Sequence, residues 1–304
     1  MPLEVGIVGL PLVGKTTLFT AMTAAGGGVE AKQEFSSIKP NVGQVNVPDE
    51  RLKVIESFIP TERIVPATVR IVDVAGLAKG ASEGVGMGNK FLAHVRQVDA
   101  VMHVVRCYDN SEPITPRDDI ETVELELVMA DLEVVVGAID KGAKAARSGD
   151  KEAVHRLELL KKCRETLDAG RPVRSMTLSA EDVKAIKSIG LITSKKVLYV
   201  ANVADDDLGG TGPHAQQVRA WAAEHGGQCV AVCAKLEAEL AEMEEAERAE
   251  MLGGLGLAEP AVASVTHAAY RLLGLQSFFT AGPKEIRAWT IPVGATAPQA
   301  AGVI

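Results

Sequence analysis

The sequence predicts an α/β fold with a mostly parallel β-sheet, and two observations carry this prediction. Short apolar runs of strand length alternate with helical stretches along most of the chain, which is the pattern of consecutive βα units. Two long segments with apolar residues at helical spacing interrupt the alternation once, between residues 118 and 195. We therefore expect an α/β domain into which an antiparallel helical hairpin is inserted.

The expected elements follow in order from the apolar runs. Residues 3–8 have the length of a buried strand, and glycines at 26–28 end the helix expected over 15–25. Further strands are expected over 69–74, 100–105, 197–201 and a segment that includes 230–232, with helices over 90–98 and 213–225.

The predicted insertion covers residues 118–195. Residues 120–146 and 154–167 carry the helical spacing, and Ser148, Gly149 and Asp150 form the turn between them. The tip of this hairpin is basic, with Lys141, Lys144, Arg147 and Lys151. Such a cluster is typical of a solvated helix end, and it also suits contact with an anionic partner such as RNA.

The C-terminal third contains an acidic stretch, which is followed by a segment with a strand-like pattern. Residues 237–250 are rich in glutamate and predict a solvated helical face. Residues 278–282 predict a strand that ends in a turn, and the stretch that follows is too short for a core of its own. We expect one domain over 3–259, with its core at 3–117 and 196–259, and a partial second domain over 276–304.

Composition limits the function classes. The chain has 304 residues, is 47% hydrophobic and 24% charged, and carries a formal charge of −8, so a basic footprint over the whole chain is excluded. We expect a cytoplasmic protein, because neither a signal peptide nor an apolar run of membrane-spanning length is visible. Cys107, Cys163, Cys229 and Cys233 are expected to be buried thiols, the last two on one expected strand.

A phosphate-binding loop is the strongest chemical signal. Residues 9–16 read GLPLVGKT, which matches GxxxxGK[ST] between an expected strand and an expected helix. The glycines let the backbone N–H groups point at phosphate oxygens, Lys15 would bridge the β- and γ-phosphates, and the Thr16 hydroxyl would ligate Mg²⁺. The expected nucleotide-binding residues of this loop are Leu12, Val13, Gly14, Lys15, Thr16 and Thr17.

A second motif follows the strand expected over 69–74. Residues 73–76 read DVAG, a DxxG pattern in the order that switch nucleotide hydrolases use. Asp73 would hold Mg²⁺ through water, and the Gly76 N–H would sense the γ-phosphate. The glycine-rich segment that follows suits a loop that responds to hydrolysis.

Two weaker motifs follow later strands. The first has the N-x-x-D outline of a base-reading motif without its usual lysine, and it comprises Asn202, Val203 and Asp205. The second has the outline of the loop that contacts the base from the other side, and it comprises Cys233, Ala234 and Lys235. Because both follow strand ends, where open α/β sheets bind ligands, we expect them to form a base-binding site.

With these residues in view, the chain resembles the YchF family, the Obg-like ATPases of the P-loop GTPase superfamily. The resemblance runs from residue 5 to residue 304. It rests on GIVGLP at 6–11, DVAGL at 73–77, KGAS at 79–82, GNKFL at 88–92, HVVRC at 103–107, ANV at 201–203, FTAG at 279–282 and RAWTIP at 287–292.

The resemblance implies an OBG-type G domain, an inserted helical coiled-coil arm and a C-terminal β-grasp (TGS) domain, inside which this chain ends. It also implies slow Mg²⁺-dependent hydrolysis of ATP by a molecular switch that binds the ribosome. Ser37 falls where the family's switch threonine ligates Mg²⁺. Leu77 falls where Ras-type enzymes place the glutamine that orients the attacking water. The resemblance thus implies three catalytic positions, which are Lys15, Gly76 and Leu77.

Two departures from the family pattern leave alternatives open. The family usually has Asn at the position of Leu12, which leaves potassium dependence open, and Glu at the position of Asp205. Asp at that position is what GTPases use to bind guanine, and Lys235 adds to that likeness, so a GTP-preferring switch is an alternative to an ATPase. A regulatory module with a structural nucleotide is a second alternative, and a P-loop kinase is disfavoured by the DxxG and base motifs. The oligomeric state stays open.

Overall fold

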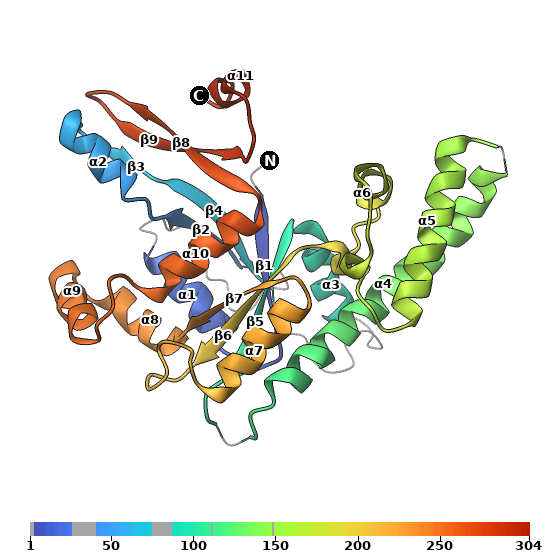
Figure 1. The fold of residues 1–304 in the computed structure, drawn as a ribbon, viewed down its shortest axis with the longest axis horizontal. Coiled ribbons are helices and arrows are strands. Elements are labelled where there is room, and N and C mark those ends of the chain that lie inside the picture. Colours follow the sequence, from blue (N-terminus) through green and yellow to red (C-terminus); the bar gives the residue numbers. More distant parts are fainter. Residues whose placement is uncertain (1–2, 26–40, 75–86, 111, 148) are drawn as a thin grey trace.

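The computed structural model describes residues 3–25, 41–74, 87–110, 112–147 and 149–304. A six-stranded sheet runs through the centre in the order β2-β4-β1-β5-β6-β7 (Figure 1). All neighbouring strands are parallel except β2, which pairs antiparallel with β4. The strands are β1 (Glu4–Val8), β2 (Asn41–Val47), β4 (Ala67–Asp73), β5 (Ala100–Cys107), β6 (Val197–Val203) and β7 (Gln228–Val232).

Helices pack on both faces of this sheet and form two apolar cores. One core combines the strands with α1 (Lys15–Ala25) and α10 (Ala261–Leu272). The other contains α3 (Met87–Gln97), α7 (Pro213–Glu224) and the first half of α4 (Pro116–Ala146), with α8 (Ala234–Glu242) and α9 (Glu245–Gly254) at its edge. The alternation of buried strands and helices that the sequence predicts is therefore confirmed. Among the described helices, none is both long and apolar enough to cross a membrane.

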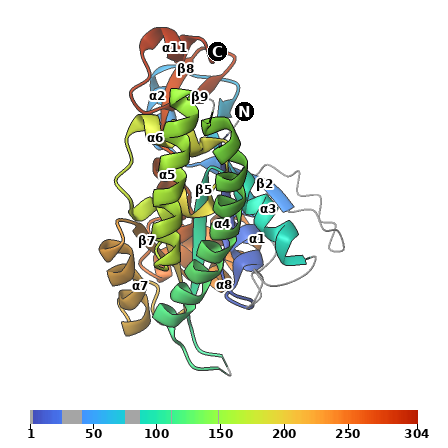
Figure 2. The same cartoon turned by 90° about the vertical axis from the view of Figure 1, so that its right-hand side faces the viewer.

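The long helix α4 pairs with α5 (Lys151–Asp168) in an antiparallel hairpin that projects from the sheet (Figures 1 and 2). The hairpin has its own apolar core, which also includes α6 (Ala180–Lys187). The buried carboxylate of Asp131 on α4 helps to join this insertion to the rest of the fold. It is fully buried and accepts hydrogen bonds from Arg96 on α3 and from the N–H groups of Ile192 and Thr193.

A small second sheet, in the order β3-β9-β8, lies beside the six-stranded sheet. β8 (Leu275–Ala281) and β9 (Ile286–Pro292) form an antiparallel hairpin, and the two-residue strand β3 (Ile64–Val65) pairs with β9 in parallel. The neighbouring helices are α2 (Arg51–Phe58) and the short α11 (Ala297–Ala301). One strand of the small sheet is thus supplied by the chain between β2 and β4.

Two expectations need correction. Glu237 does not lie on a solvated face: only 2% of it is exposed, and its carboxylate accepts hydrogen bonds from the N–H groups of Ala261 and Val262 at the start of α10. Cys233 is not on the strand that holds Cys229, because β7 ends at Val232 and Cys233 is the N-cap of α8. The four cysteines are free, and all but the half-buried Cys229 are buried.

Candidate functional site

The loop between β1 and α1 has a backbone that requires glycine at two positions. Gly9 has a φ of +149°, and a Cβ there would lie 2.5 Å from the carbonyl oxygen of Val104. Gly14 has a φ of +91°, and a Cβ there would lie 2.3 Å from Nδ2 of Asn202. The motif glycines are therefore needed for both conformation and space.

Lys15 folds back over this loop. Its Nζ donates hydrogen bonds to the carbonyls of Gly9 (3.0 Å) and Leu10 (2.6 Å), and the residue is buried. Burial lowers the pKa of Lys15 to about 8, and the nearby carboxylate of Asp73 offsets part of that effect. The Lys15 ammonium thus lies at the phosphate-binding loop, where burial disfavours its charge and the Asp73 carboxylate is a nearby anion.

The predicted Mg²⁺ ligands Thr16 and Asp73 are adjacent. The Thr16 hydroxyl donates to Oδ2 of Asp73 over 3.3 Å, and burial raises the pKa of that carboxyl. The described residues contain no group of three or more His, Cys, Asp or Glu side chains that could hold a metal by themselves. A hydroxyl beside one carboxylate fits Mg²⁺, which takes few protein oxygens and completes its shell with phosphates and water.

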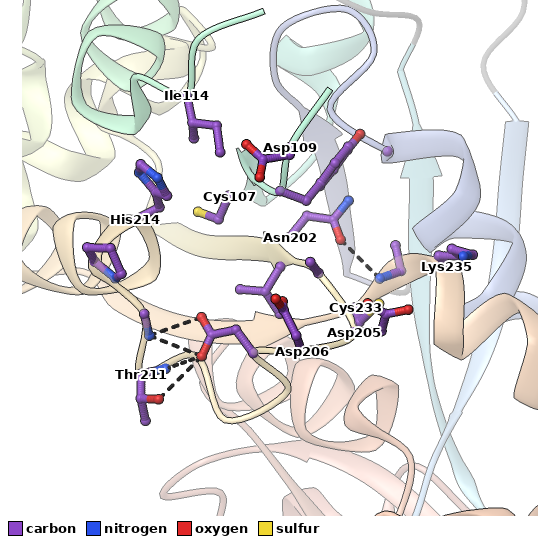
Figure 3. A pocket seen from close by; sticks show the side chains of 18 of the residues that line it. Cys107, Asp109, Ile114, Asn202, Asp205, Asp206, Thr211, His214, Cys233 and Lys235 are labelled. Carbon is purple, nitrogen blue, oxygen red and sulfur yellow. Dashed lines mark hydrogen bonds between the residues drawn. The ribbon is translucent and has the colours of Figure 1, made fainter. Parts of the chain in front are cut away.

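Next to the loop lies a pocket of about 770 Å³. Of the residues expected to bind the nucleotide, Gly14, Thr17, Asn202, Val203, Asp205, Cys233, Ala234 and Lys235 line it. Lys235 lies toward one end of this pocket, Ile114 and His214 lie toward the other, and Asn202 lies between them (Figure 3). Residues from separate strand ends are therefore brought to one cavity.

Asn202 connects the two loops of the base-binding site. Its Nδ2 donates to the carbonyl of Val13 over 2.9 Å, and its Oδ1 accepts from the N–H of Ala234 over 3.0 Å. The side chain is buried, and both of its polar atoms are used. Asn202 thus fixes the phosphate-binding loop against the start of α8. Asp205, which is exposed, lines the same pocket with a carboxylate that can accept hydrogen bonds.

One wall of the pocket was not predicted from the sequence. Tyr108, Asp109 and Ile114 line it from the loop between β5 and α4. His214 lines it from the first turn of α7, and the Nδ1 atom of this side chain is buried without a hydrogen-bond partner among the described residues. The sequence offers one signal for this wall, which is the position of its loop. The loop follows the buried strand β5, and the neighbouring strands β1 and β6 end in nucleotide-binding motifs.

Three expected residues fall outside the part of the chain that the structure describes. Ser37 lies in the segment 26–40, and Gly76 and Leu77 lie in the segment 75–86. Their roles stay predictions. Leu12 and Val13 are in the described loop, and their carbonyls face side chains of neighbouring elements.

Comparison with known proteins agrees with this geometry. A family model described as a 50S ribosome-binding GTPase matches residues 4–139. A model of the C-terminal region of YchF GTPases, described as a protein of unknown function, matches residues 275–304. The two matches cover the phosphate-binding loop and the small sheet.

Full-length relatives and a solved structure extend the match to the whole chain. The chain is 47% identical to proteins called ribosome-binding ATPase YchF from Haemophilus ducreyi and Escherichia coli O157:H7, over 100% of this chain and 85% of each relative. The Bacillus subtilis protein of the same name is 45% identical with the same coverage. The structure of the Schizosaccharomyces pombe YchF GTPase superposes with a TM-score of 0.85 at 34% identity, over 99% of this chain and 83% of that one. The chain therefore belongs to the YchF family of nucleotide hydrolases, which have the P-loop GTPase fold.

Proposed function

We propose that this protein is a Mg²⁺-dependent nucleoside triphosphatase that prefers ATP, turns over slowly, and acts as a switch on the ribosome. One observation carries the nucleotide part of the proposal. The carbonyls of Leu12 and Val13 accept hydrogen bonds from the side chains of Tyr108 and Asn202, which lie outside the loop. Because these carbonyls are held by the protein, the N–H groups of the same loop are left to face phosphate oxygens.

Each residue of the loop has a separate role in this proposal. Lys15 would leave the carbonyls of its own loop and pair with the β- and γ-phosphates, which restores the charge that burial disfavours. Thr16 and Asp73 would hold Mg²⁺, with Ser37 as a third oxygen donor. The ion would neutralise charge that develops on the phosphates during transfer. Gly76 would report the γ-phosphate, and Leu77 supplies no hydrogen bond to water, which supports slow turnover.

The hydrolase proposal has a direct test. Purified protein with Mg²⁺ and ATP should release phosphate above the level of a Lys15→Ala control, and GTP should be tried in parallel. Phosphate release that stays at the control level, with and without ribosomes, would instead support the alternative of a regulatory module with a structural nucleotide.

The preference for ATP follows from the family, and Asp205 supports the GTP alternative. A carboxylate at this place accepts two N–H donors from guanine, whereas adenine presents one amino group. A titration of non-hydrolysable ATP and GTP analogues on one preparation separates the two. Tenfold tighter ATP binding, about 1.4 kcal/mol, supports the ATPase assignment, and tighter GTP binding makes the protein a GTPase.

Ribosome binding is proposed from the names of the relatives and from the charge of the hairpin. Residues 136–171 carry nine Lys and Arg against six Asp and Glu, although the whole chain is acidic. Lys141, Lys144, Arg147 and Lys151 at its tip are all exposed. Rows of exposed cations on a projecting hairpin suit the phosphate backbone of RNA.

Charge reversal tests this contact. Changing Lys141, Lys144, Arg147 and Lys151 to Glu should weaken co-sedimentation with ribosomes and reduce its dependence on salt. A matched control reverses four exposed charges elsewhere, at Lys53, Lys196, Arg219 and Lys284. Equal pellet fractions for the two variants would argue against the hairpin tip as the contact.

A further inference from the structure

One hydrogen bond joins two walls of the nucleotide pocket and involves a residue to which the nucleotide motifs give no role. The hydroxyl of Tyr108 donates to the carbonyl of Leu12 over 2.8 Å. Leu12 belongs to the phosphate-binding loop, and Tyr108 begins the loop between β5 and α4. Both loops contribute to the pocket lining, through Gly14 on one side and Tyr108 and Asp109 on the other. The bond therefore ties these two loops together at the nucleotide site.

Tyr108 is held in place by the strand that precedes it. The buried guanidinium of Arg106, near the end of β5, donates to the carbonyls of Tyr108, Glu112 and Pro113 and to Oδ1 of Asn110, at distances of 2.6–3.4 Å. One side chain thus holds the carbonyl of Tyr108 and three described residues that follow it in this loop. The hydroxyl that reaches Leu12 is presented from a rigid support rather than from a free loop.

The residue at the other end of the bond is in an unfavourable conformation. Leu12 has a φ of 61°, and it is the only described residue other than glycine with a positive φ. A branched apolar side chain disfavours this left-handed conformation, and with 83% of Leu12 exposed, packing does little to compensate. The bonds from Tyr108 to Leu12 and from Asn202 to Val13 hold two successive carbonyls of the strained segment.

We propose that Tyr108 is a positioning residue that holds the phosphate-binding loop in its binding conformation and thereby slows nucleotide release. This inference rests on the proposed nucleotide binding. Tyr108 acts through the carbonyl of Leu12 and not on the reacting atoms. When the hydroxyl is removed, the left-handed conformation of Leu12 loses one of its two side-chain supports, so the loop should open more often and the nucleotide should leave faster.

The test measures release of a radiolabelled non-hydrolysable ATP analogue from the full chain after a chase with unlabelled analogue. Tyr108→Phe keeps the ring and removes the hydroxyl, and the loss of one hydrogen bond should raise the dissociation rate about 2- to 10-fold. The association rate should change little. Tyr270→Phe is the matched control, because its hydroxyl bonds to the carbonyl of Gln276, outside this pocket.

A second variant separates positioning from a general loss of stability. Asn tolerates the left-handed conformation better than Leu, so Leu12→Asn should make the loop less dependent on Tyr108. The effect of Tyr108→Phe should therefore shrink to less than about 2-fold in the Leu12→Asn background. If wild type binds and Tyr108→Phe releases nucleotide at the wild-type rate, or if its effect is equal in both backgrounds, the positioning role is wrong. If wild type retains no ATP or GTP analogue, the proposed function itself has failed.

Discussion

Asp131 offers the sharpest prediction about how the inserted hairpin is attached. The fully buried carboxylate accepts hydrogen bonds from the N–H groups of Ile192 (3.1 Å) and Thr193 (2.7 Å), from the Thr193 hydroxyl (2.7 Å) and from Arg96 (2.6 Å). Asp131→Ala removes the acceptor of all four hydrogen bonds at once. The two N–H groups belong to residues that are themselves almost completely buried, so water cannot replace the carboxylate without a rearrangement.

The expected cost follows from these contacts. A buried donor left without a partner costs about 1–3 kcal/mol, and removal of one member of a buried ion pair costs about 3–5 kcal/mol. Arg96 keeps its bonds to the carbonyls of Ala130 and Gly190, which limits the loss on that side. We therefore expect Asp131→Ala to reduce the free energy of unfolding by about 3–5 kcal/mol.

Urea denaturation followed by circular dichroism measures this effect. Asp168→Ala on α5 is the control: Asp168 pairs with Arg164 at an exposed position, so its loss should cost less than about 0.5 kcal/mol. Asp131→Asn keeps the size and one acceptor oxygen, and it provides an intermediate value if the alanine variant does not fold. Variants at Asp131 and Asp168 with equal unfolding midpoints would refute the attachment role.

Three further predictions concern the nucleotide site and the hairpin. Gly14→Ala should abolish nucleotide binding in a filter assay, because the new Cβ would lie 2.3 Å from the Asn202 amide, and retained affinity would contradict the backbone conformation described for this loop. Gly137→Ala, in α4 with no atom within 4 Å of the added Cβ, should instead raise the unfolding free energy by about 0.5–1 kcal/mol, and a loss of stability would contradict the helix. Because the pKa of Lys15 is lowered to about 8, the lysine loses its proton as pH rises through that value, and nucleotide affinity should fall above about pH 8, with proton uptake on binding. A nucleotide affinity that stays constant up to about pH 9.5 would contradict the predicted fall.

The parts of the structure that the sequence predicted have local causes. Strands such as β1 and β5 are mainly apolar and almost continuously buried, because both faces of a parallel sheet are covered. The phosphate-binding loop is one contiguous motif, so its glycines, lysine and threonine are recognisable without any knowledge of the rest of the fold. The helix expected over 15–25 and the observed α1 have the same bounds.

The parts that the sequence did not predict depend on distant residues. β2 lies at the edge of the sheet, and polar residues and a glycine interrupt its apolar positions, which masks the strand pattern. β3 is a strand because Ile64 pairs with Ile286, more than 200 residues away. Glu237 is buried because the start of α10 lies over it, and its own neighbourhood in the sequence indicates only an acidic helix.

The same reason explains the missed wall of the pocket. Tyr108 belongs to no nucleotide motif, and its role depends on the support from Arg106 and on the approach of Leu12, which is 96 residues away in the chain. Asn202, in contrast, was predicted from its motif, although its bonds to Val13 and Ala234 could be seen only in three dimensions.

Binding of a nucleoside triphosphate with Mg²⁺ by the loop of residues 9–16 underlies every role proposed for this protein. Isothermal titration of a non-hydrolysable ATP analogue, and of its GTP counterpart, into wild type and Lys15→Ala measures this binding directly. We expect one saturable site in wild type that depends on Mg²⁺ and is at least about tenfold weaker in Lys15→Ala, a difference of about 1.4 kcal/mol. Equal affinity of the two proteins, or binding that ignores Mg²⁺, would contradict the assignment of the loop.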